Sequence, residues 1–447
     1  DGLAALVTGE KRVVIGVRSA ILAPMENVGL IIVDEEHDGS YKQSDIDPRY
    51  QARDVAVMRA HFQKALVVLG SATPSFESYH NALVDKYRLV TLASRFGAAR
   101  LPKVSIVDMC REHRENNWAI LSRQLHRSIS ETLIDRRQVI LLLNRRGFSA
   151  LLLCKQCGHT HACPHCSVKL TYHKTGHDLQ CHQCGYCEPA PERCPRCKGE
   201  QLLYKGTGIQ KAEEYLKAEF PQARLIRMDQ DTTRQKGAHL HILEKFARQE
   251  ADILLGTQMV SKGLNFPGVA LVGVLQADIG LHIPDFRASE KTFQLLAQVA
   301  GRAGREDSSG EVIIQTYVPE DPCILAAAGH DFIGFYTREI GGREGLGYPP
   351  AGKLIRIVVQ GEAEAAVRPA IAAIAAAIAR RAAPGVAVLG PAPAVFSRIK
   401  NKYRHCLLLK SGSMKALQSI AGYVRQIMAR PPKGVKVIID VDPVNML

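Results

Sequence analysis

The stretch "LIIVDEEH", residues 30 to 37, decides the interpretation of the first part of this chain. Its apolar half has the length and β-branched content of a buried strand, and acidic residues and a histidine follow at once. At the carboxyl end of such a strand, Asp34 can hold Mg²⁺ through water and Glu35 can orient and deprotonate an attacking water. His37 would sense the nucleotide. These residues suit the acidic half of a nucleotide hydrolysis site, and an acidic cap on a following helix is the alternative.

The phosphate-binding half of such a site does not occur in the printed sequence. Its pattern, G-x-x-x-x-G-K-[ST], is absent from all 447 residues. The first residues, "DGLAALVTGEKRVV", contain neither an initiator methionine nor a signal sequence, so we expect a fragment that begins inside its first domain. The phosphate loop should then lie roughly 60 to 100 positions before Asp34.

Short β-branched runs with helical stretches between them recur along the chain, which is typical of an α/β fold with parallel sheets. The runs form two series: residues 13–17, 30–36 and 65–72, then residues 138–144, 251–257, 269–275 and 311–316. We therefore predict a first sheet domain at residues 1–95, an irregular connector at 96–121, and a second sheet domain at 122–153 with 200–335. Residues 340–447 are predicted to form a small, basic α+β domain.

Nine of the twelve cysteines fall between Cys154 and Cys197. They include four C-x-x-C pairs, whose eight thiolates are the number that two closed tetrahedral zinc sites require. We predict an inserted region, residues 154–199, with two structural Zn²⁺ ions and with Gly158, Gly185 and Gly199 at its turns. The predicted ligands are Cys154, Cys157, Cys163, Cys166, Cys181, Cys184, Cys194 and Cys197.

The pairing of these ligands is open from the sequence, because a short linker can place neighbouring pairs on one metal or nest one site within another. We favour nesting, in which the two outer pairs hold one ion and the two inner pairs hold the other. Rival ligands are Cys187, His159, His165 and His182. A redox role for the C-x-x-C pairs is the remaining alternative.

The net charge of +14 is concentrated near the C-terminus, where residues 343–447 carry 16 Lys and Arg against 5 Asp and Glu. In "SRIKNKYRHCLLL", residues 397–409, Arg398, Lys400 and Arg404 surround Tyr403, which suits the phosphates of branched DNA. A solvated charged face is the alternative. The longest apolar run is about half the length of a membrane span, so no membrane partner is expected.

Three further motifs follow the acidic turn in a fixed order. "GSATPS", residues 70–75, follows the next strand, and "GTQMVSKGLNFPGV", residues 256–269, is a polar, glycine-bearing loop suited to phosphate contacts. In "QVAGRAGR", residues 298–305, the two arginines are three positions apart and can face one phosphate. Each motif is weak by itself, and their order is specific.

In their order and residue patterns these motifs resemble those of the superfamily 2 helicases. Among these helicases, the zinc insertion indicates a resemblance to the PriA family of primosomal replication-restart helicases. The resemblance covers nearly the whole chain and implies two RecA-like domains that clamp ATP and Mg²⁺ between them. Asp34 and Glu35 match the Walker B acids. The other implied roles are coupling of hydrolysis to DNA for Ser71, Ala72 and Thr73, nucleotide contact for Gly263, completion of the ATP site for Gln298, Arg302 and Arg305, and DNA binding for Arg145, Arg146, Thr257 and Gln258.

Helicases of this family also carry an aromatic-rich loop after the acidic motif that is thought to sense DNA. The matching segment here is "DGSYKQSDIDPRYQARD", residues 38–54. Tyr41 and Tyr50 are expected to stack on bases. Phosphate contacts are expected from Lys42, Arg49 and Arg53. Packing of Tyr50 at the start of a helix is the alternative.

The resemblance implies an ATP-dependent 3′-5′ DNA helicase that recognises stalled or branched replication forks and initiates primosome assembly in the bacterial cytoplasm, associated with the nucleoid. Implied partners are fork DNA, single-stranded DNA, primosome proteins and single-strand-binding protein. The alternatives are a non-hydrolysing zinc-containing scaffold that binds forks, and another superfamily 2 repair translocase. The chain alone should bind zinc and DNA but hydrolyse ATP poorly or not at all.

Overall fold

The computed structural model describes residues 2–92, 101–143, 152–164, 169–173, 176–181, 185–203, 209–229, 232–233, 237–257, 266–302, 310–381 and 385–446. The chain divides into two compact units. One unit combines Asp1–Val90, Arg343–Leu389 and Arg398–Met446, and the other combines Thr91–Gly342 with Gly390–Ser397. Within the described ranges, no helix combines the length and the apolar character that crossing a bilayer requires.

The N-terminal part contains a parallel pair of short strands. β1 (Leu30–Val33) and β2 (Leu66–Leu69) pair residue for residue, and α2 (Ala52–Gln63) connects them. α3 (Phe76–Leu83) follows β2, and the Ser75 hydroxyl caps it by accepting from the Ser78 amide. The shorter elements are α1 (Gly2–Val7), η1 (Arg18–Leu22) and η2 (Gly39–Tyr41).

Both strands of this pair leave apolar side chains exposed. Leu30, Ile32, Leu66 and Val68 are between 43% and 66% exposed, although parallel sheets are normally covered on both faces. The predicted strand at residues 13–17 is wrong, since this segment is not assigned to a strand and Ile15 is 95% exposed. β-branched residues favour a strand only where a neighbouring strand and packing partners support it.

A six-stranded parallel sheet forms the core of the other unit. Its spatial order is β10 (Leu225–Met228), β11 (Ile253–Gly256), β4 (Gln138–Leu142), β12 (Val269–Val274), β13 (Glu311–Thr316) and β3 (Lys103–Asp108). Every residue of β4 and β11 is buried. The continuous apolar runs of the second series therefore correspond to central strands, as predicted.

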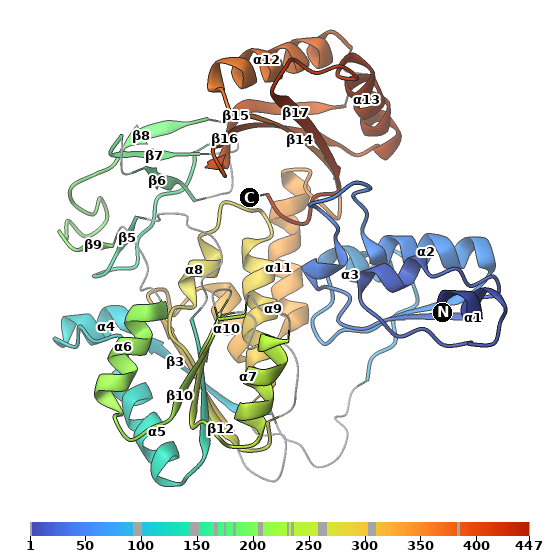
Figure 1. The fold of residues 1–447 in the computed structure, drawn as a ribbon. Coiled ribbons are helices and arrows are strands. Elements are labelled where there is room, and N and C mark those ends of the chain that lie inside the picture. The colour runs from blue at the N-terminus through green and yellow to red at the C-terminus, as the bar shows by residue number, and fades with distance from the viewer. Residues whose placement is uncertain are drawn as a thin grey trace. The chain divides into compact units, whose positions relative to one another are not determined.

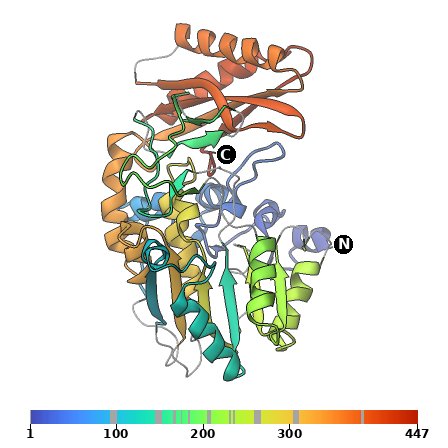
Figure 2. The ribbon, with the colours of Figure 1, turned by 90° about the vertical axis from the view of Figure 1, so that its left-hand side faces the viewer.

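Helices cover both faces of this sheet, as Figures 1 and 2 show. α5 (Arg123–Ile134) and α6 (Ile209–Glu219) lie on one face, and α7 (Ala238–Ala247), α9 (Ala288–Ala300) and α10 (Pro322–Ala328) lie on the other. On the first face, Leu125, Ile129 and Leu216 pack in one cluster with strand residues such as Leu141 and Leu255. The short helix α8 (Asp278–Leu281) follows β12.

The prediction that residues 96–121 form a connector is wrong. Lys103–Asp108 form β3, which pairs with β13 over six positions, and α4 (Met109–Arg114) follows directly. β3 is an edge strand with a single neighbour, and only one of its six residues is buried. A strand with one partner and partial burial has a weak hydrophobic pattern, which explains why its sequence looks irregular.

The cysteine-rich region has little regular structure. β5 (Leu153–Cys154) pairs with β9 (Leu202–Leu203), while β6 (Thr171–His173), β7 (Asp178–Gln180) and β8 (Cys187–Pro189) form an antiparallel meander. Its buried residues form one small cluster that contains Leu152, Leu170 and Leu179 together with two cysteines. A core of this size needs an additional cross-link to be stable, which bound metal would supply.

The C-terminal domain is an antiparallel sheet with helices on one face (Figure 1). β15 (Ala387–Ile399), β16 (Lys402–Ser411), β14 (Lys353–Gly361) and β17 (Val435–Val441) lie side by side in that order. α12 (Glu364–Arg381) and α13 (Met414–Ile427) pack on Ile355, Ile357 and Leu407. α11 (Phe332–Gly345) precedes the domain. The predicted fold class, α/β sheets with a cysteine-rich insertion and a small α+β domain, is confirmed.

Candidate functional site

The acidic turn follows β1 without a break. Asp34 is exposed at the carboxyl end of the strand, and its Oδ1 accepts a 2.9 Å hydrogen bond from the Glu35 amide. Glu35 has a φ of 46°, in the left-handed region that non-glycine residues seldom adopt. The Glu35 side chain is 47% exposed and its Oε2 lies 3.6 Å from His37 Nδ1. An exposed carboxylate beside a second one is a donor set that fits Mg²⁺ with its bound waters.

His37 joins the acidic turn to the segment after β2. Its Nδ1 lies 2.7 Å from Ser71 Oγ, which also accepts a 3.0 Å hydrogen bond from the Thr73 amide. The two strand ends are adjacent because Val33 pairs with Leu69. The structure thus brings together two motifs that are 34 positions apart, and their role in coupling hydrolysis to DNA stays a prediction.

Glu36 is a buried carboxylate that connects three segments of the chain, and the sequence did not indicate this role. Its side chain is almost completely buried and accepts hydrogen bonds from the Ser75 amide and from the hydroxyls of Ser75 and Ser78, at 2.6 to 3.0 Å. Arg53 Nη1 on α2 lies 3.1 Å from the same carboxylate. One charge therefore joins the acidic turn, α2 and the start of α3. The only signal in the sequence is an acid next to Glu35, and that cannot be told apart from a second catalytic acid.

Replacing Glu36 with glutamine is expected to lower the free energy of local opening around β1, α2 and α3 by about 3 kcal/mol, because it removes the buried charged partner of Arg53 and leaves that guanidinium only the exposed Asp54 carboxylate. Hydrogen exchange of the amides in these elements measures this quantity directly. The control is Asp54→Asn, since Asp54 is 52% exposed and pairs with the same arginine; its effect should stay below about 1 kcal/mol. Equal protection of these amides from hydrogen exchange in both variants would show that the Glu36 carboxylate does not hold the three elements together.

The segment after the acids differs in part from the predicted DNA-sensing loop. Lys42 is buried, the Arg53 side chain is 12% exposed, and both are paired with carboxylates, so the expectation that they contact phosphate is wrong. Tyr41 donates a 2.7 Å hydrogen bond to the Asp34 carbonyl, and burial, followed by the charges of Asp34, Asp38 and Glu35, raises its pKa. Tyr50 is half-buried just before α2. Base stacking by the two tyrosines stays a prediction.

The arginine-bearing motif lies at the end of α9 in the other unit. Gln298 is half-buried on the last turn, and Arg302 follows the C-cap Gly301. Thr257 comes directly after β11, and its amide donates to the Met228 carbonyl. The remaining predicted residues of this part, Arg145, Arg146, Gln258, Gly263 and Arg305, lie outside the described residues.

Asp278 is a second buried carboxylate that the sequence did not single out. It accepts hydrogen bonds from the Thr316 hydroxyl and the Tyr317 amide, and so joins α8 to the end of β13. Burial raises the pKa of this carboxyl to about 6, and the hydrogen bonds from Thr316 and Tyr317 only partly offset that effect. The group therefore titrates in the range where most aspartates are fully ionised.

The raised pKa of Asp278 predicts a pH-dependent stability. Between pH 4 and 6 the unfolded chain releases this proton and the folded chain keeps it, so stability falls as pH rises and is flat above pH 6. From the ordinary value of 3.8 to about 6, the loss is about 3 kcal/mol. The difference in unfolding free energy between wild type and Asp278→Asn, measured by urea at pH 4, 5, 6 and 7, should change by about 2 kcal/mol, which is most of this amount, because over half of the unfolded chains have already released the proton at pH 4. A difference that does not vary with pH would refute the assignment.

The outer cysteine pairs form a four-sulfur cluster. The Sγ atoms of Cys154, Cys157, Cys194 and Cys197 all lie within 4.8 Å of one another. The Cys154–Cys197 and Cys157–Cys194 separations are 3.6 and 3.5 Å. A tetrahedral zinc with Zn–S bonds of about 2.3 Å requires sulfurs about 3.8 Å apart, so the four residues fit this metal. Pairing of the two outer C-x-x-C motifs, which we favoured, is confirmed.

The backbone of the outer cluster is also built for metal binding. The Gly158 amide donates to the Cys154 carbonyl and the Lys198 amide to the Cys194 carbonyl, both at 2.8 Å, and both donors have positive φ. These are matching knuckle turns. Although burial alone would raise it, hydrogen bonds from the backbone of Cys197 and Arg196 and from neighbouring thiols lower the pKa of Cys194 to about 7. Burial raises the pKa of the neighbouring Cys154 and Cys157 thiols, so the zinc assignment rests on the geometry of the four sulfurs.

The inner pairs are only partly described. Cys163 and Cys181 are both buried in the small cluster of this region, and Cys166 and Cys184 lie outside the described residues. The Gly185 amide donates to the Cys181 carbonyl at 2.9 Å with a φ of 82°, which repeats the outer knuckle turn. Cys187 is exposed, and its thiol donates to Asp178. The second zinc site stays a prediction.

The predicted basic patch lies at the β15–β16 hairpin. Lys400 and Asn401 form its two-residue turn, both with positive φ, as tight hairpins require. The Arg398 guanidinium stacks 5.0 Å from the Tyr403 ring centre, and Arg398 and Lys400 are exposed. Arg404 differs, since burial and the charge of Arg356 lower its pKa. DNA binding by these residues stays a prediction, with Arg404 the least accessible.

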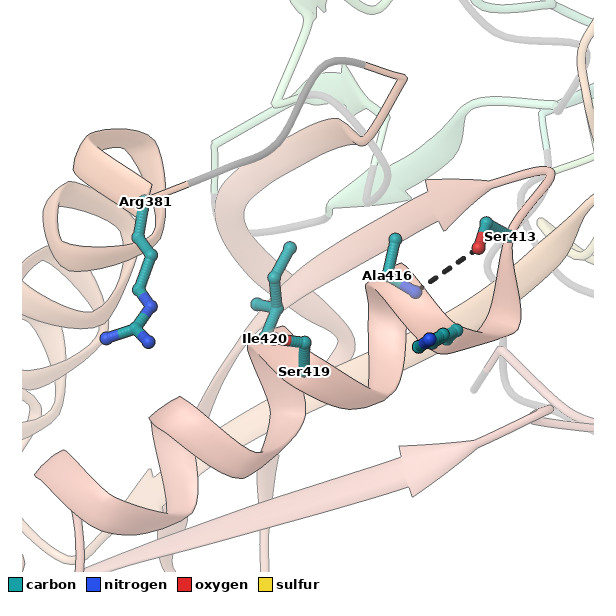
Figure 3. A pocket seen from close by; sticks show the side chains of 6 residues that line it. Arg381, Ser413, Ala416, Ser419 and Ile420 are labelled. Atoms are coloured by element: carbon teal, nitrogen blue, oxygen red, sulfur yellow. Dashed lines mark hydrogen bonds between the residues drawn. The ribbon is translucent and has the colours of Figure 1, made fainter.

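A shallow pocket lies elsewhere on the same domain, between the end of α12 and the start of α13 (Figure 3). The Ser413 hydroxyl accepts a hydrogen bond from the Ala416 amide and so caps α13. The pocket is lined by Arg381, Ser413, Lys415, Ala416, Ser419 and Ile420. It adds two cations to the basic surface of the domain.

Family models match three parts of the chain. The model described as "Primosomal protein N C-terminal domain" matches residues 344–444, and "PriA DNA helicase Cys-rich region (CRR) domain" matches residues 163–189. "Helicase conserved C-terminal domain" matches residues 195–307. The matches thus fall on the C-terminal sheet, the cysteine-rich region and the second parallel sheet.

Curated relatives match almost the whole chain. The replication restart protein PriA of Bacillus subtilis is 45% identical over 98% of this chain and 54% of its own length. The Rickettsia conorii protein of that name is 40% identical over 99% of this chain and 67% of its own length. The chain therefore spans about half to two thirds of these relatives. A solved structure of RecG bound to a three-way DNA junction is 13% identical over 72% of this chain and 34% of that chain, with a TM-score of 0.34, which is too distant to carry an argument.

Proposed function

Because the chain belongs to the PriA family of replication restart proteins, we propose that it is the motor portion of an ATP-dependent 3′-5′ DNA helicase. The complete protein would recognise stalled or branched replication forks and initiate primosome assembly. The observation that carries the proposal is the acidic turn after β1, with its His37–Ser71 link to the next motif. The acidic turn, the cysteine region, the arginine motif and the basic domain of this chain would then serve one function.

The residues of the acidic turn would have different roles in ATP hydrolysis. Asp34 would hold the Mg²⁺ of Mg·ATP, which neutralises the phosphate charge when bound. Glu35 would orient the attacking water and accept its proton. Arg302 and Arg305 would stabilise the charge on the γ-phosphate from the second lobe. Exposure of Asp34 and of the Glu35 side chain supports these roles, because both must reach a nucleotide.

The outer four-sulfur cluster would hold one structural Zn²⁺ and the inner pairs a second. Zinc there would cross-link a region whose own core is too small.

The basic C-terminal domain would bind fork DNA, with Arg398 and Lys400 on the backbone. Primosome proteins and single-strand-binding protein are the proposed protein partners. The second candidate, a zinc-containing scaffold that binds forks without hydrolysis, agrees with the basic domain and the cysteine cluster. It gives no reason for the acidic turn and its link to Ser71.

Strand displacement by the complete protein tests the proposal. Partial duplexes with a 3′ tail on the bound strand should be unwound in the presence of ATP, and those with only a 5′ tail should not. A matched assay without Mg²⁺ provides the blank. Binding of forks without displacement of either substrate would favour the scaffold.

A further inference from the structure

A buried ion pair ties the segment after the acidic turn to the C-terminal sheet, and both partners lie in one compact unit. Lys42 Nζ lies 2.9 Å from Asp440 Oδ1 and donates a 2.6 Å hydrogen bond to the Val441 carbonyl. The two side chains are 2% and 5% exposed. Asp440 also lies 3.7 Å from the guanidinium of Arg356, its register partner on β14. The lysine therefore ends inside the C-terminal domain.

The residue before Lys42 contacts the acidic turn instead. The Tyr41 hydroxyl donates a 2.7 Å hydrogen bond to the carbonyl of Asp34. Arg18 holds the backbone here, because its Nη1 donates to the carbonyls of Ser40 and Lys42 at 3.1 and 2.8 Å. One peptide bond therefore separates a contact to the proposed Mg²⁺ ligand from a contact to the last strand of the C-terminal sheet.

Lys42 also closes the base of the loop that follows it. It forms an antiparallel bridge with Gln51, and the Gln43 amide donates to the Tyr50 carbonyl at 2.8 Å. Between these positions, Ile46 at the tip is 71% exposed. A displacement of the loop would therefore reach Lys42 and Tyr41 at one end and Gln51 and α2 at the other.

A buried ion pair contributes little net stability, because the loss of hydration roughly cancels the attraction between the charges. Its best-attested use is to fix one arrangement of two elements against others. The Lys42–Asp440 pair is placed for such a role, since it joins a residue of the segment after the acidic turn to the last strand of the C-terminal sheet. The expected effect of the ion pair is to fix the position of the segment next to Asp34.

We propose that Lys42 is a positioning residue through which the C-terminal domain controls ATP hydrolysis. The Asp440 carboxylate positions the Lys42 side chain, and Lys42 thereby positions its neighbour Tyr41. The hydrogen bond from the Tyr41 hydroxyl then positions the backbone at Asp34. DNA bound by the C-terminal domain or by the loop at residues 43–50 would then act on the acidic turn through this chain of contacts. The inference rests on the proposed function and adds the route by which DNA stimulates it.

The test is ATP hydrolysis by the complete protein, with and without forked DNA. Lys42→Met keeps most of the side-chain volume and removes the charge. We expect the ratio of stimulated to unstimulated rate to fall about fivefold or more, with the fork affinity and the zinc content unchanged. Lys217→Met is the matched control, because Lys217 forms an exposed ion pair with Glu213 on α6; its ratio should equal that of the wild type.

A further variant keeps the test decisive if Lys42→Met folds poorly. Asp440→Asn is nearly isosteric and should lower the same ratio. A wild-type ratio in both Lys42→Met and Asp440→Asn would overturn the inference and leave the proposed function standing. Absence of stimulation in the wild type would instead defeat the proposed function.

Discussion

Replacing Glu35 with glutamine in the complete protein is expected to lower kcat for DNA-stimulated ATP hydrolysis by about 10²- to 10⁴-fold. Glutamine keeps the shape of the side chain and can still hold a water by hydrogen bonding, but it cannot accept the proton that the attacking water loses. Asp34 remains in place to hold the metal, so ATP and DNA affinity should change little. Phosphate release at saturating ATP and fork DNA measures the effect.

Glu26→Gln is the matched control for this substitution. Glu26 is an exposed acid in the same part of the chain, four positions before β1, and it lies in none of the predicted motifs. Its rate should equal that of the wild type. A Glu35→Gln protein that hydrolyses ATP at the wild-type rate would show that the acidic turn is not the catalytic half of an ATP site.

Replacing Cys157 with serine is expected to reduce the zinc content from about two ions to about one per chain and to unfold the outer knuckles. Cys157 is one of the four sulfurs that lie within 4.8 Å of one another. Structural zinc in small sites contributes about 10 to 16 kcal/mol of apparent binding free energy, which the weak core of this region cannot replace. Metal analysis of the purified protein gives the stoichiometry, and limited proteolysis between residues 152 and 203 shows the loss of structure.

The Cys187→Ser variant tests whether Cys187 is a zinc ligand. Cys187 is exposed, and the contact that its thiol makes is a hydrogen bond to Asp178 on β7. This variant should keep two ions per chain. Loss of one ion in Cys187→Ser, with Cys157→Ser unchanged, would reverse the assignment of ligands.

The strands that could be predicted are those that the sheet buries on both sides. β11 is a short apolar run, and β4 is apolar after its first residue, Gln138; such runs have few alternatives to a central parallel strand. β3 could not be found in this way, because an edge strand needs only part of its surface to be apolar. The run at residues 13–17 shows the opposite error, since its composition suits a strand and the described residues provide no neighbour for it.

The role of a side chain could be predicted where its own chemistry determines that role. It could not be predicted where the role depends on a contact with a residue far away in the sequence. The cysteines of the C-x-x-C pairs are an example of the first kind, because zinc needs four thiolates per closed site, although the sequence alone leaves the pairing of the motifs open. Lys42 is an example of the second. A lysine in a polar loop normally extends into solvent, and only the fold brings it to Asp440, which is 398 positions away. Glu36 is similar, because nothing in the local sequence shows that its neighbour Glu35 is exposed while Glu36 itself is buried.

The rate of ATP hydrolysis by the complete protein, measured with and without forked DNA at one salt concentration, tests the central claim most directly. The claim is that this chain carries most of a DNA-dependent motor, with catalytic acids after β1 and arginines after α9. We predict that fork DNA raises the rate about tenfold or more. Equal rates with and without the fork would contradict it.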